Sequence, residues 1–212
     1  MPRPAPPHRP LAGRHVALHP LRAGHGPGLF AAFTADTEGR NWTYLPIEPF
    51  ADVHEATDWA AQAAASRDPL FYTILTPGDV PAGFCSPLRI APEQGSIEVG
   101  YINFAPALQG TTAATEAMAL LMAHVFDDLG YRRYEWKCDA LNAPSRRAAE
   151  RLGFTYEGTF RQATHYKGRN RDTAWFSILD SEWPALKTRF DTWLDPSNFD
   201  ADGLQRRPLT NI

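Results

Sequence analysis

Hydrophobic and polar positions follow two different periods along this chain, and the changes of period predict its secondary structure. Alternation with a period of two indicates strands, and apolar residues three or four positions apart indicate helices. A helix after Thr112 has apolar residues at helical spacing and ends at Leu129, where Gly130 suits the stop. Strands are expected at 15–19, 70–76, 83–90, 97–104, 131–139, 154–165 and 173–179, and further helices at 24–35, 54–67, 142–152 and 183–193.

The order of these elements predicts a mixed α/β domain around one sheet. Turn residues at 77–79 and 92–95 join three of the strands into an antiparallel meander. Helix, strand, helix and two more strands follow the meander without a linker. We expect a mobile Pro-rich arm at 1–11, a catalytic body at 12–185, and a helix end with an extended tail at 186–212.

Composition narrows the class of protein. The 212 residues are 43% hydrophobic, which is ordinary for a globular chain, and the net charge of −3 provides no basic field for nucleic acid. No run of 18 apolar residues occurs and the N-terminus does not read as a secretory signal, so we expect no membrane association. Two cysteines suit a reduced, cytoplasmic setting, and the seven histidines show no coordination spacing, so no metal is expected.

The start of the helix at Gly110–Ala114 is the first candidate for chemistry. Small residues at a helix start let a ligand approach free backbone N–H groups, and the helix dipole favours an anion there. A pyrophosphate is the obvious candidate, and an ordinary helix cap is the alternative. The segment is neither a P-loop, because no Gly-Lys-Ser/Thr follows, nor a dinucleotide fingerprint, because its three glycines are missing.

Three ordered motifs make the chain resemble the GNAT acetyltransferases, and its nearest branch looks like the RimJ/RimL type. The first is Gln109–Ala117, the second is Asn142–Ser145 followed by Arg151–Phe154, and the third is the Glu-Val-Gly-Tyr strand at 98–101. The resemblance covers about residues 12–185. It implies a mostly antiparallel mixed sheet of six to seven strands flanked by helices, in which two central strands splay apart to form a cleft for CoA.

The resemblance also assigns residues to acetyl-CoA, the expected co-substrate. Its pyrophosphate would rest on the helix start, its pantetheine arm would pair like a strand with the end of 97–104, and the loop after 131–139 would face the arm and thiol. Thr112 stands where the family has a glycine, and its side chain affects how closely the phosphates can approach the backbone of the helix start. Gly100 is expected at the bulge that separates the strands. The implied contacts are Ile102, Asn103, Phe104, Gln109, Gly110, Thr111, Thr112, Ala113, Ala114, Asn142 and Ser145.

The implied reaction is N-acetyl transfer to a primary amine, on a protein N-terminus or a small molecule, by direct attack in a ternary complex. A GNAT-fold module that binds acyl-CoA with little turnover is the alternative. Members of such a family would act as monomers or homodimers.

The candidate catalytic residues follow from the proton transfers that this reaction needs. Glu98 is the candidate general base, directly or through water; the alternative is that it pairs with Arg89 or Arg133 across the sheet. Many family members protonate the departing thiolate with a tyrosine, but this chain has Ala149 there. Ser145 is the first substitute and Tyr101 the second, with solvent water as a competitor.

The acceptor is expected at the other end of the cleft, against exposed aromatic side chains. Candidates in the loop after the first helix are Trp42 and Tyr44, and those in the strand region are His165 and Tyr166. The alternative for Trp42 is that it covers the core.

Overall fold

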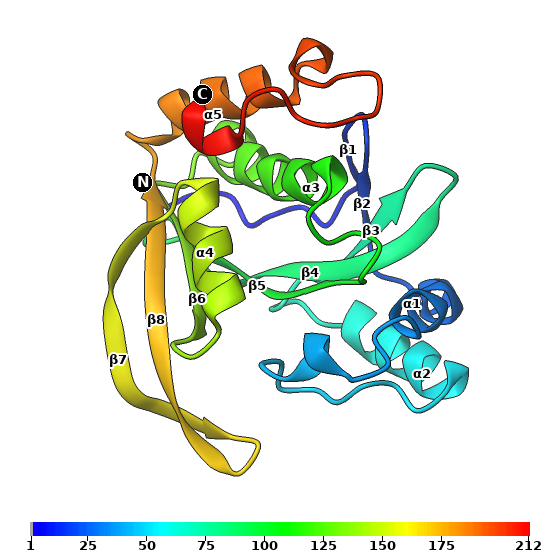
Figure 1. Ribbon diagram of the computed structural model, residues 1–212. Helices are drawn as coiled ribbons and strands as arrows, with labels where there is room; N and C mark the ends of the chain where they lie inside the picture. The colour runs from blue at the N-terminus through cyan, green and yellow to red at the C-terminus, as the bar shows by residue number, and fades with distance from the viewer. Residues whose placement is uncertain (1) are drawn as a thin grey trace.

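The computed structural model describes residues 2–212, which form one eight-stranded sheet with helices on both faces (Figure 1). The strands are β1 (Leu11–Ala12), β2 (Ala17–Pro20), β3 (Tyr72–Thr76), β4 (Val80–Ala91), β5 (Ser96–Phe104), β6 (Arg133–Asp139), β7 (Thr155–Tyr166) and β8 (Arg169–Leu179). The helices are α1 (Gly26–Phe33), α2 (Val53–Ala64), α3 (Thr112–Ala123), α4 (Ala143–Leu152) and α5 (Trp183–Leu194).

The order of strands in the sheet is β1-β2-β3-β4-β5-β6-β8-β7. Every neighbouring pair is antiparallel except β5 and β6, which are parallel because α3 carries the chain back between them. The expected mixed α/β fold with a mostly antiparallel sheet is confirmed. The sheet has one strand more than the pattern predicted, since β1 has only two residues and is too short to show alternation.

The sheet separates two cores. Helices α3, α4 and α5 cover one face, and α1 and α2 cover the β2–β4 part of the other (Figure 1). The first core includes Met118, Tyr134 and Phe176. The second is rich in aromatic side chains, among them Trp42 and Phe84. The sheet is therefore covered on both sides near β4, and its β6–β8–β7 end is left with an uncovered face.

The β7–β8 hairpin is longer than the pattern predicted. A tight turn at Lys167 and Gly168, with φ of 45° and 72°, joins the strands, so that β8 begins at Arg169 rather than near Thr173. The polar run before Thr173 is typical of a loop, but here it pairs with β7, and Arg171 within it lines a cavity. At the turn, Lys167 Nζ donates to the carbonyl of Trp42 over 2.8 Å, which ties the hairpin to the aromatic loop.

Both ends of the chain pack on the body. In the N-terminal arm, His8 Nε2 lies 2.8 Å from the carbonyl of Phe71, and Arg9 pairs with Asp128 over 2.8 Å. In the tail, Leu209 is fully buried in the first core. The mobility expected of the arm stays a prediction, which hydrogen exchange would test. None of the helices within residues 2–212 is long and apolar enough to cross a membrane.

Candidate active site

A V-shaped cleft opens where β5 and β6 stop pairing. Their parallel register ends at Val99 and Trp136, and the two strands diverge beyond this point. On its other edge β5 carries a bulge against β4, where the register shifts by one residue and Tyr101 adopts a φ of 48°. Gly100 adjoins this bulge, and a Cβ on it would lie 3.0 Å from Leu88 Cδ2. The cleft is therefore a product of local strand geometry.

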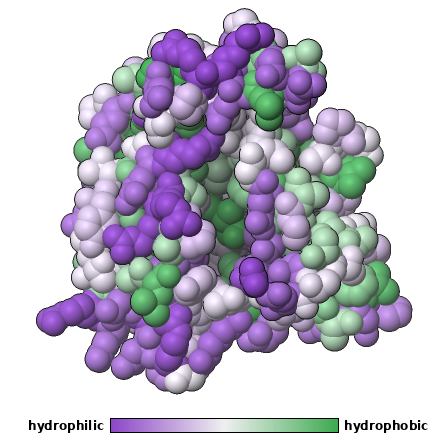
Figure 2. All heavy atoms as spheres, viewed as in Figure 1, coloured by the Kyte–Doolittle hydropathy of each residue, from purple (hydrophilic) through white to green (hydrophobic). Residues whose placement is uncertain are grey.

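Two cavities meet in this cleft. The first, the α3 cavity, has a volume of about 680 Å³ and lies between the end of β5, the start of α3 and helix α4. Figure 2 shows a hollow near the middle of this face, with hydrophobic residues at its floor and hydrophilic side chains along its rim. Three arginines line the α3 cavity and no described residue of its lining is a carboxylate. These arginines are Arg40, Arg147 and Arg151.

The electrostatics of the α3 cavity favour a polyanion. Burial lowers the pKa of Arg151, and the positive charge of Arg189 lowers it further. Arg151 Nη1 donates to Thr115 Oγ1 over 3.1 Å and forms no ion pair with the described residues. An anionic ligand would supply the missing countercharge.

The backbone at the start of α3 carries free donors. The N–H of Thr111 is donated to the carbonyl of Leu108, and that of Ala114 to Thr111 Oγ1, the helix cap. No acceptor within residues 2–212 takes the N–H groups of Gly110, Thr112 and Ala113. Gly110 has a φ of 72°, which favours glycine, and open space where a Cβ would lie. An anion placed here would therefore meet the free N–H groups of the first turn.

Side-chain amides line the end of β5. Asn103 is 2% exposed, and its Nδ2 is buried without a partner within the described residues. Gln109 Nε2 donates to the carbonyl of Phe104 and to Asn41 Oδ1, over 2.9 and 2.8 Å. Gln109 therefore ties the loop at Asn41 to β5, while Asn103 keeps a donor free.

The wall between the two cavities contains Asn142 and Ser145, the residues expected to face the pantetheine arm and the thiol of CoA. Trp136 Nε1 donates to Ser145 Oγ over 3.0 Å, so the Ser145 hydroxyl keeps its own proton available for donation. Asn142 caps α4 by accepting from the backbone N–H of Ser145 over 3.1 Å. The Tyr44 hydroxyl donates to the carbonyl of Leu141, the residue before Asn142, over 3.1 Å. Both cavities are lined by Asn41, Tyr44, Ile102, Trp136, Asn142 and Ser145.

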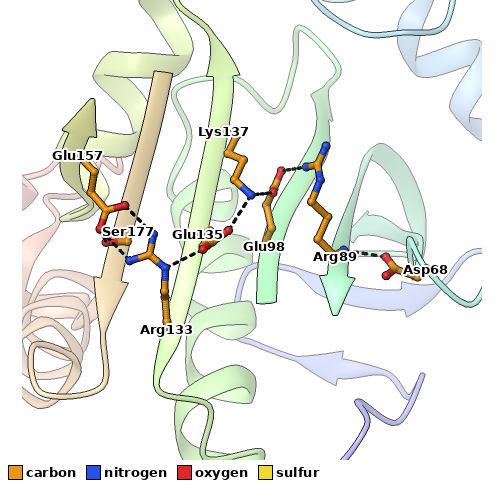
Figure 3. Close-up of polar contacts among 8 residues, drawn as sticks. All are labelled: Asp68, Arg89, Glu98, Arg133, Glu135, Lys137, Glu157 and Ser177. Atoms are coloured by element: carbon orange, nitrogen blue, oxygen red, sulfur yellow. Dashed lines mark hydrogen bonds and ion pairs between the residues drawn. The ribbon is translucent and has the colours of Figure 1, made fainter. Parts of the chain in front are cut away.

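The second cavity, the hairpin cavity, has a volume of about 560 Å³ and lies between β4, β5, β6 and the β7–β8 hairpin. Its floor is part of a chain of charged side chains that crosses the sheet (Figure 3). In this chain Lys137 lies between Glu98 and Glu135, at 2.8 and 2.7 Å from their oxygens. Burial raises the pKa of Glu135, but hydrogen bonds from Lys137 and Arg133 outweigh it and hold that pKa below its ordinary value.

Glu98 lies in this chain between Lys137 and Arg89 and is 3% exposed. Its Oε1 accepts from Arg89 over 2.6 Å and its Oε2 pairs with Lys137 (Figure 3). The pairing with Arg89 is the alternative that the sequence left open, whereas Arg133 pairs with Glu135 and Glu157 instead. A carboxylate has about four lone-pair sites, so these two contacts leave sites that can accept a hydrogen bond from a water.

Asp139 ends β6 beside the hairpin and is 1% exposed. It accepts from the Leu141 N–H and the Tyr166 hydroxyl over 2.9 and 2.8 Å, and it pairs with Arg169. Burial raises the pKa of Asp139, but these partners outweigh it and hold the pKa below its ordinary value. Burial and the Asp139 carboxylate raise the pKa of Tyr166 to about 12. Asp139 is thus a fixed anion that orients the hairpin.

Of the four residues expected to bind the acceptor, two line a cavity and two do not. Tyr44 and Tyr166 line the hairpin cavity. Trp42 is 2% exposed and packs in the second core, the alternative considered for it, while His165 is exposed and lines neither cavity. Of the catalytic candidates, Glu98 and Tyr101 line the hairpin cavity, and Ser145 lines both cavities.

Several cavity residues had no signal in the sequence analysis. Lys137 and Trp175 are far apart in sequence, and only the β6–β8 register makes them neighbours. Alternation along β8 would have placed Arg171 and Trp175 on one face of the sheet if the strand had been predicted to begin at Arg169.

Burial raises the pKa of Cys138, the thiol in this cavity, so Cys138 is held as a neutral thiol. Ala149, at the position where the family resemblance implies a tyrosine, is fully buried.

No group of three or more histidine, cysteine, aspartate or glutamate side chains within residues 2–212 is arranged to hold a metal ion.

A bulged sheet whose parallel central strands splay beside a free helix N-terminus defines the class of CoA-dependent acyltransferases. The sequence profile of the acetyltransferase (GNAT) domain matches residues 15–155, and the chain belongs to that family. Its members transfer an acetyl group from acetyl-CoA, and the chain is an N-acetyltransferase.

Solved structures and curated sequences agree with this assignment. A GCN5-related N-acetyltransferase from Brucella melitensis is 49% identical with a TM-score of 0.96, over 99% of this chain and 96% of that one. The uncharacterized N-acetyltransferase p20 of Bacillus licheniformis is 32% identical over 66% of this chain and 80% of its own length. The putative ribosomal N-acetyltransferase YdaF of Bacillus subtilis is 27% identical over 69% of this chain and 80% of its own length.

Proposed function

We propose that this protein transfers the acetyl group of acetyl-CoA to a primary amine by direct attack in a ternary complex, within the RimJ/RimL-like branch. The acceptor is a protein N-terminus or a small-molecule amine. One observation carries the proposal: an arginine-lined cavity and a second cavity share one wall at the splay of β5 and β6. A donor entering from one side and an acceptor entering from the other would meet at that wall.

The residues of the α3 cavity fit CoA. The free N–H groups at the start of α3 and the three arginines suit phosphates, which are anionic and have several acceptor oxygens. The unpartnered Nδ2 of Asn103 suits an amide carbonyl of the pantetheine arm. We propose that the arm runs along 102–104 toward Ser145, where the thioester would lie.

The proposed reaction needs two proton transfers. A neutral amine attacks the thioester carbon, a nitrogen–carbon bond forms, and the carbon–sulfur bond breaks to release the CoA thiolate. Glu98, through a water, takes the proton that the amine loses. Ser145, with Tyr101 as its substitute, passes a proton to the thiolate and regains one through solvent as Glu98 releases its own. A backbone N–H near Ile102 polarises the thioester carbonyl.

The nature of the amine decides how much the base contributes. An alkyl ammonium with a pKa near 10.4 costs about 4–5 kcal/mol to deprotonate at pH 7, whereas an α-amine near 7.8 costs about 1 kcal/mol. We expect E98Q to lower kcat about 100-fold for an alkyl amine and much less for a dipeptide. Unchanged turnover of both from pH 6 to 9 would rule out the base. R89Q, which removes a cation from Glu98 and keeps the carboxylate, is the matched control.

Two measurements test the proposed function itself. At 100 times its Kd, acetyl-CoA stabilises the folded state by about 2.7 kcal/mol, which for a chain of this size raises Tm by roughly 5–10 °C. Release of free thiol over a panel of dipeptides, polyamines, aminoglycosides and amino acids then detects turnover. A raised Tm with no release over the whole panel would favour the acyl-CoA-binding module. An unchanged Tm would exclude both functions.

A further inference from the structure

One positive charge in the hairpin cavity has no counterpart. Four of the charged side chains on its lining are ion-paired: Arg89 and Lys137 with Glu98, and Asp139 with Arg169. Arg171, on β8, forms no ion pair within residues 2–212. The cavity therefore presents one cation in excess to whatever enters it.

Two buried donors accompany that charge. The Nε of Arg171 and the Nε1 of Trp175 are buried without an acceptor among the described residues. They lie four residues apart on β8, so their side chains share one face of the sheet, and both residues line the hairpin cavity. Leaving a buried donor without a partner costs about 1–3 kcal/mol. Two such donors on one cavity wall indicate a ligand with acceptor oxygens.

The surrounding side chains hold these donors in place. The Arg171 guanidinium lies over the ring of Tyr166, 5.5 Å from its centroid, and Tyr166 is fixed by its bond to Asp139. The ring of Trp175 stacks on Phe160 with centroids 4.5 Å apart. Lys137 Nζ lies 3.8 Å from the centroid of Trp175 on the same wall. A preorganised guanidinium loses little freedom when it binds a planar or tetrahedral oxyanion.

No neighbouring carboxylate is free to pair with Arg171. Asp139 already accepts from Leu141, Tyr166 and Arg169. The adjacent Asp172 accepts the backbone N–H of Gln162 over 2.7 Å, which holds it at the register shift between β7 and β8. A bound anion would supply the countercharge that these carboxylates do not.

We propose that Arg171 and Trp175 form an oxyanion subsite, and that the acceptor carries a carboxylate or a phosphate on the same molecule as its primary amine. The inference rests on the proposed function, because the hairpin cavity is the acceptor side of the shared wall. It names a substrate class: anionic amines rather than plain monoamines or polyamines. Arg171 supplies charge and a fork of donors, and Trp175 supplies one further donor.

The test compares acceptors that differ only in the anion. Comparing alanyl-aspartate amide with alanyl-asparagine amide tests for recognition of a carboxylate. Comparing 3-aminopropyl phosphate with 3-aminopropanol tests for recognition of a phosphate. In at least one pair, we expect kcat/KM for the anionic acceptor to be about 10- to 100-fold higher than for the neutral one, because one charge-assisted hydrogen bond contributes a free energy of that size. The difference should appear mainly in KM. The pair that shows the preference identifies the oxyanion.

Variants then assign the preference to the subsite. R171Q should remove the preference, so that the ratio within the pair falls toward one, while R171K keeps the charge and should retain part of it. R161Q is the matched control, because Arg161 is an exposed arginine on the adjacent strand that lines neither cavity. A rise in Tm with acetyl-CoA shows that each variant is folded.

Each outcome has a definite reading. Equal kcat/KM within both pairs, or a preference that survives in R171Q, would overturn the subsite. Turnover of the neutral acceptors without any anionic preference would overturn the subsite and leave the proposed function standing. Absence of thiol release from every acceptor, including those of the broader panel, would instead overturn the proposed function.

Discussion

Ser145 is held at both its backbone and its side chain. Its backbone N–H is held by the Asn142 cap, and its hydroxyl oxygen accepts from Trp136, so the direction of its proton is constrained. S145A keeps the cap and removes only the hydroxyl. If Ser145 protonates the thiolate, kcat should fall about 100-fold in a thiol-release assay while the Kd for acetyl-CoA stays close to wild type.

The control for S145A is S181A, at an exposed serine outside both cavities. A wild-type kcat in S145A would show that the proton comes from Tyr101 or from solvent, and Y101F would separate those two sources.

Asp139 makes stability depend on pH in a calculable direction. Its pKa in the folded protein is below that in the unfolded chain, so as pH falls the unfolded state takes up a proton first. The stabilisation by this group is complete near pH 7 and is lost as pH falls below about 4 and through the folded-state pKa. D139N should cost about 1–3 kcal/mol at pH 7, and its deficit should shrink toward pH 3.

Urea midpoints of the wild type and D139N at pH 7 and pH 3 measure that difference. D58N is the control, since Asp58 is exposed on α2 and forms no hydrogen bond or ion pair within residues 2–212. A deficit for D139N that is equal at both pH values would contradict the assignment.

At the scale of elements, the start of α3 can be changed one N–H group at a time. Thr112 is the first helical residue, where proline is well tolerated, and Thr111 before it has the extended backbone that proline requires of its neighbour. T112P therefore removes one free N–H without breaking the helix. We expect the Kd for acetyl-CoA to rise about 10-fold by calorimetry, with little change in the Tm of the free protein.

T112A is the matched control because it removes the hydroxyl and keeps the N–H. An unchanged Kd in T112P would show that the phosphates do not contact this N–H. An equal loss in T112A would assign the contact to the hydroxyl instead.

The elements that the sequence predicted well are those with internal periodicity. The meander, α4 and the start of α3 were predicted within a few residues of their observed bounds, because apolar positions recur regularly along them. The helix that was predicted to end at Leu129 is α3 only as far as Ala123, and a π-helical turn at His124–Asp128 continues it. The β7–β8 hairpin was predicted too short, because Arg169–Asp172 is polar on both faces and strand pairing alone extends it. β1 has too few residues for any pattern.

In the candidate site too, the sequence located only those residues that form a contiguous motif. The helix start and the Asn142–Ser145 segment are contiguous motifs, so the resemblance located them. The charged chain through Lys137 depends on register between strands that are distant in sequence, and no local pattern reports register. Trp42 shows the converse: an aromatic residue in a polar loop was expected at the cavity, but it fills the second core.

At the scale of the whole molecule, the C-terminal tail contributes to stability although it lies outside the predicted catalytic body. Leu209 is fully buried in the first core, and Gln205 lines the α3 cavity. L209A leaves a cavity in that core and should cost about 2–5 kcal/mol in urea unfolding. L204A, in the same tail at a side chain that is 66% exposed, should change stability by less than about 0.5 kcal/mol. Similar effects of the two would mean that the tail does not pack as described.

The ion pairs of Lys137 also bear on chemistry that the protein must avoid. An acetyltransferase exposes its own amines to an activated acetyl group, and self-acetylation would block the site. Only three lysines occur among the 21 Lys and Arg residues, the others being arginines, which stay charged in proteins. Each lysine ammonium is paired with carboxylates: Lys137 with Glu98 and Glu135, Lys167 with Glu48, and Lys187 with Asp127. Lys137 Nζ is held between two carboxylates and its side chain is 8% exposed, so the one lysine on the wall of the hairpin cavity is poorly placed to attack a thioester.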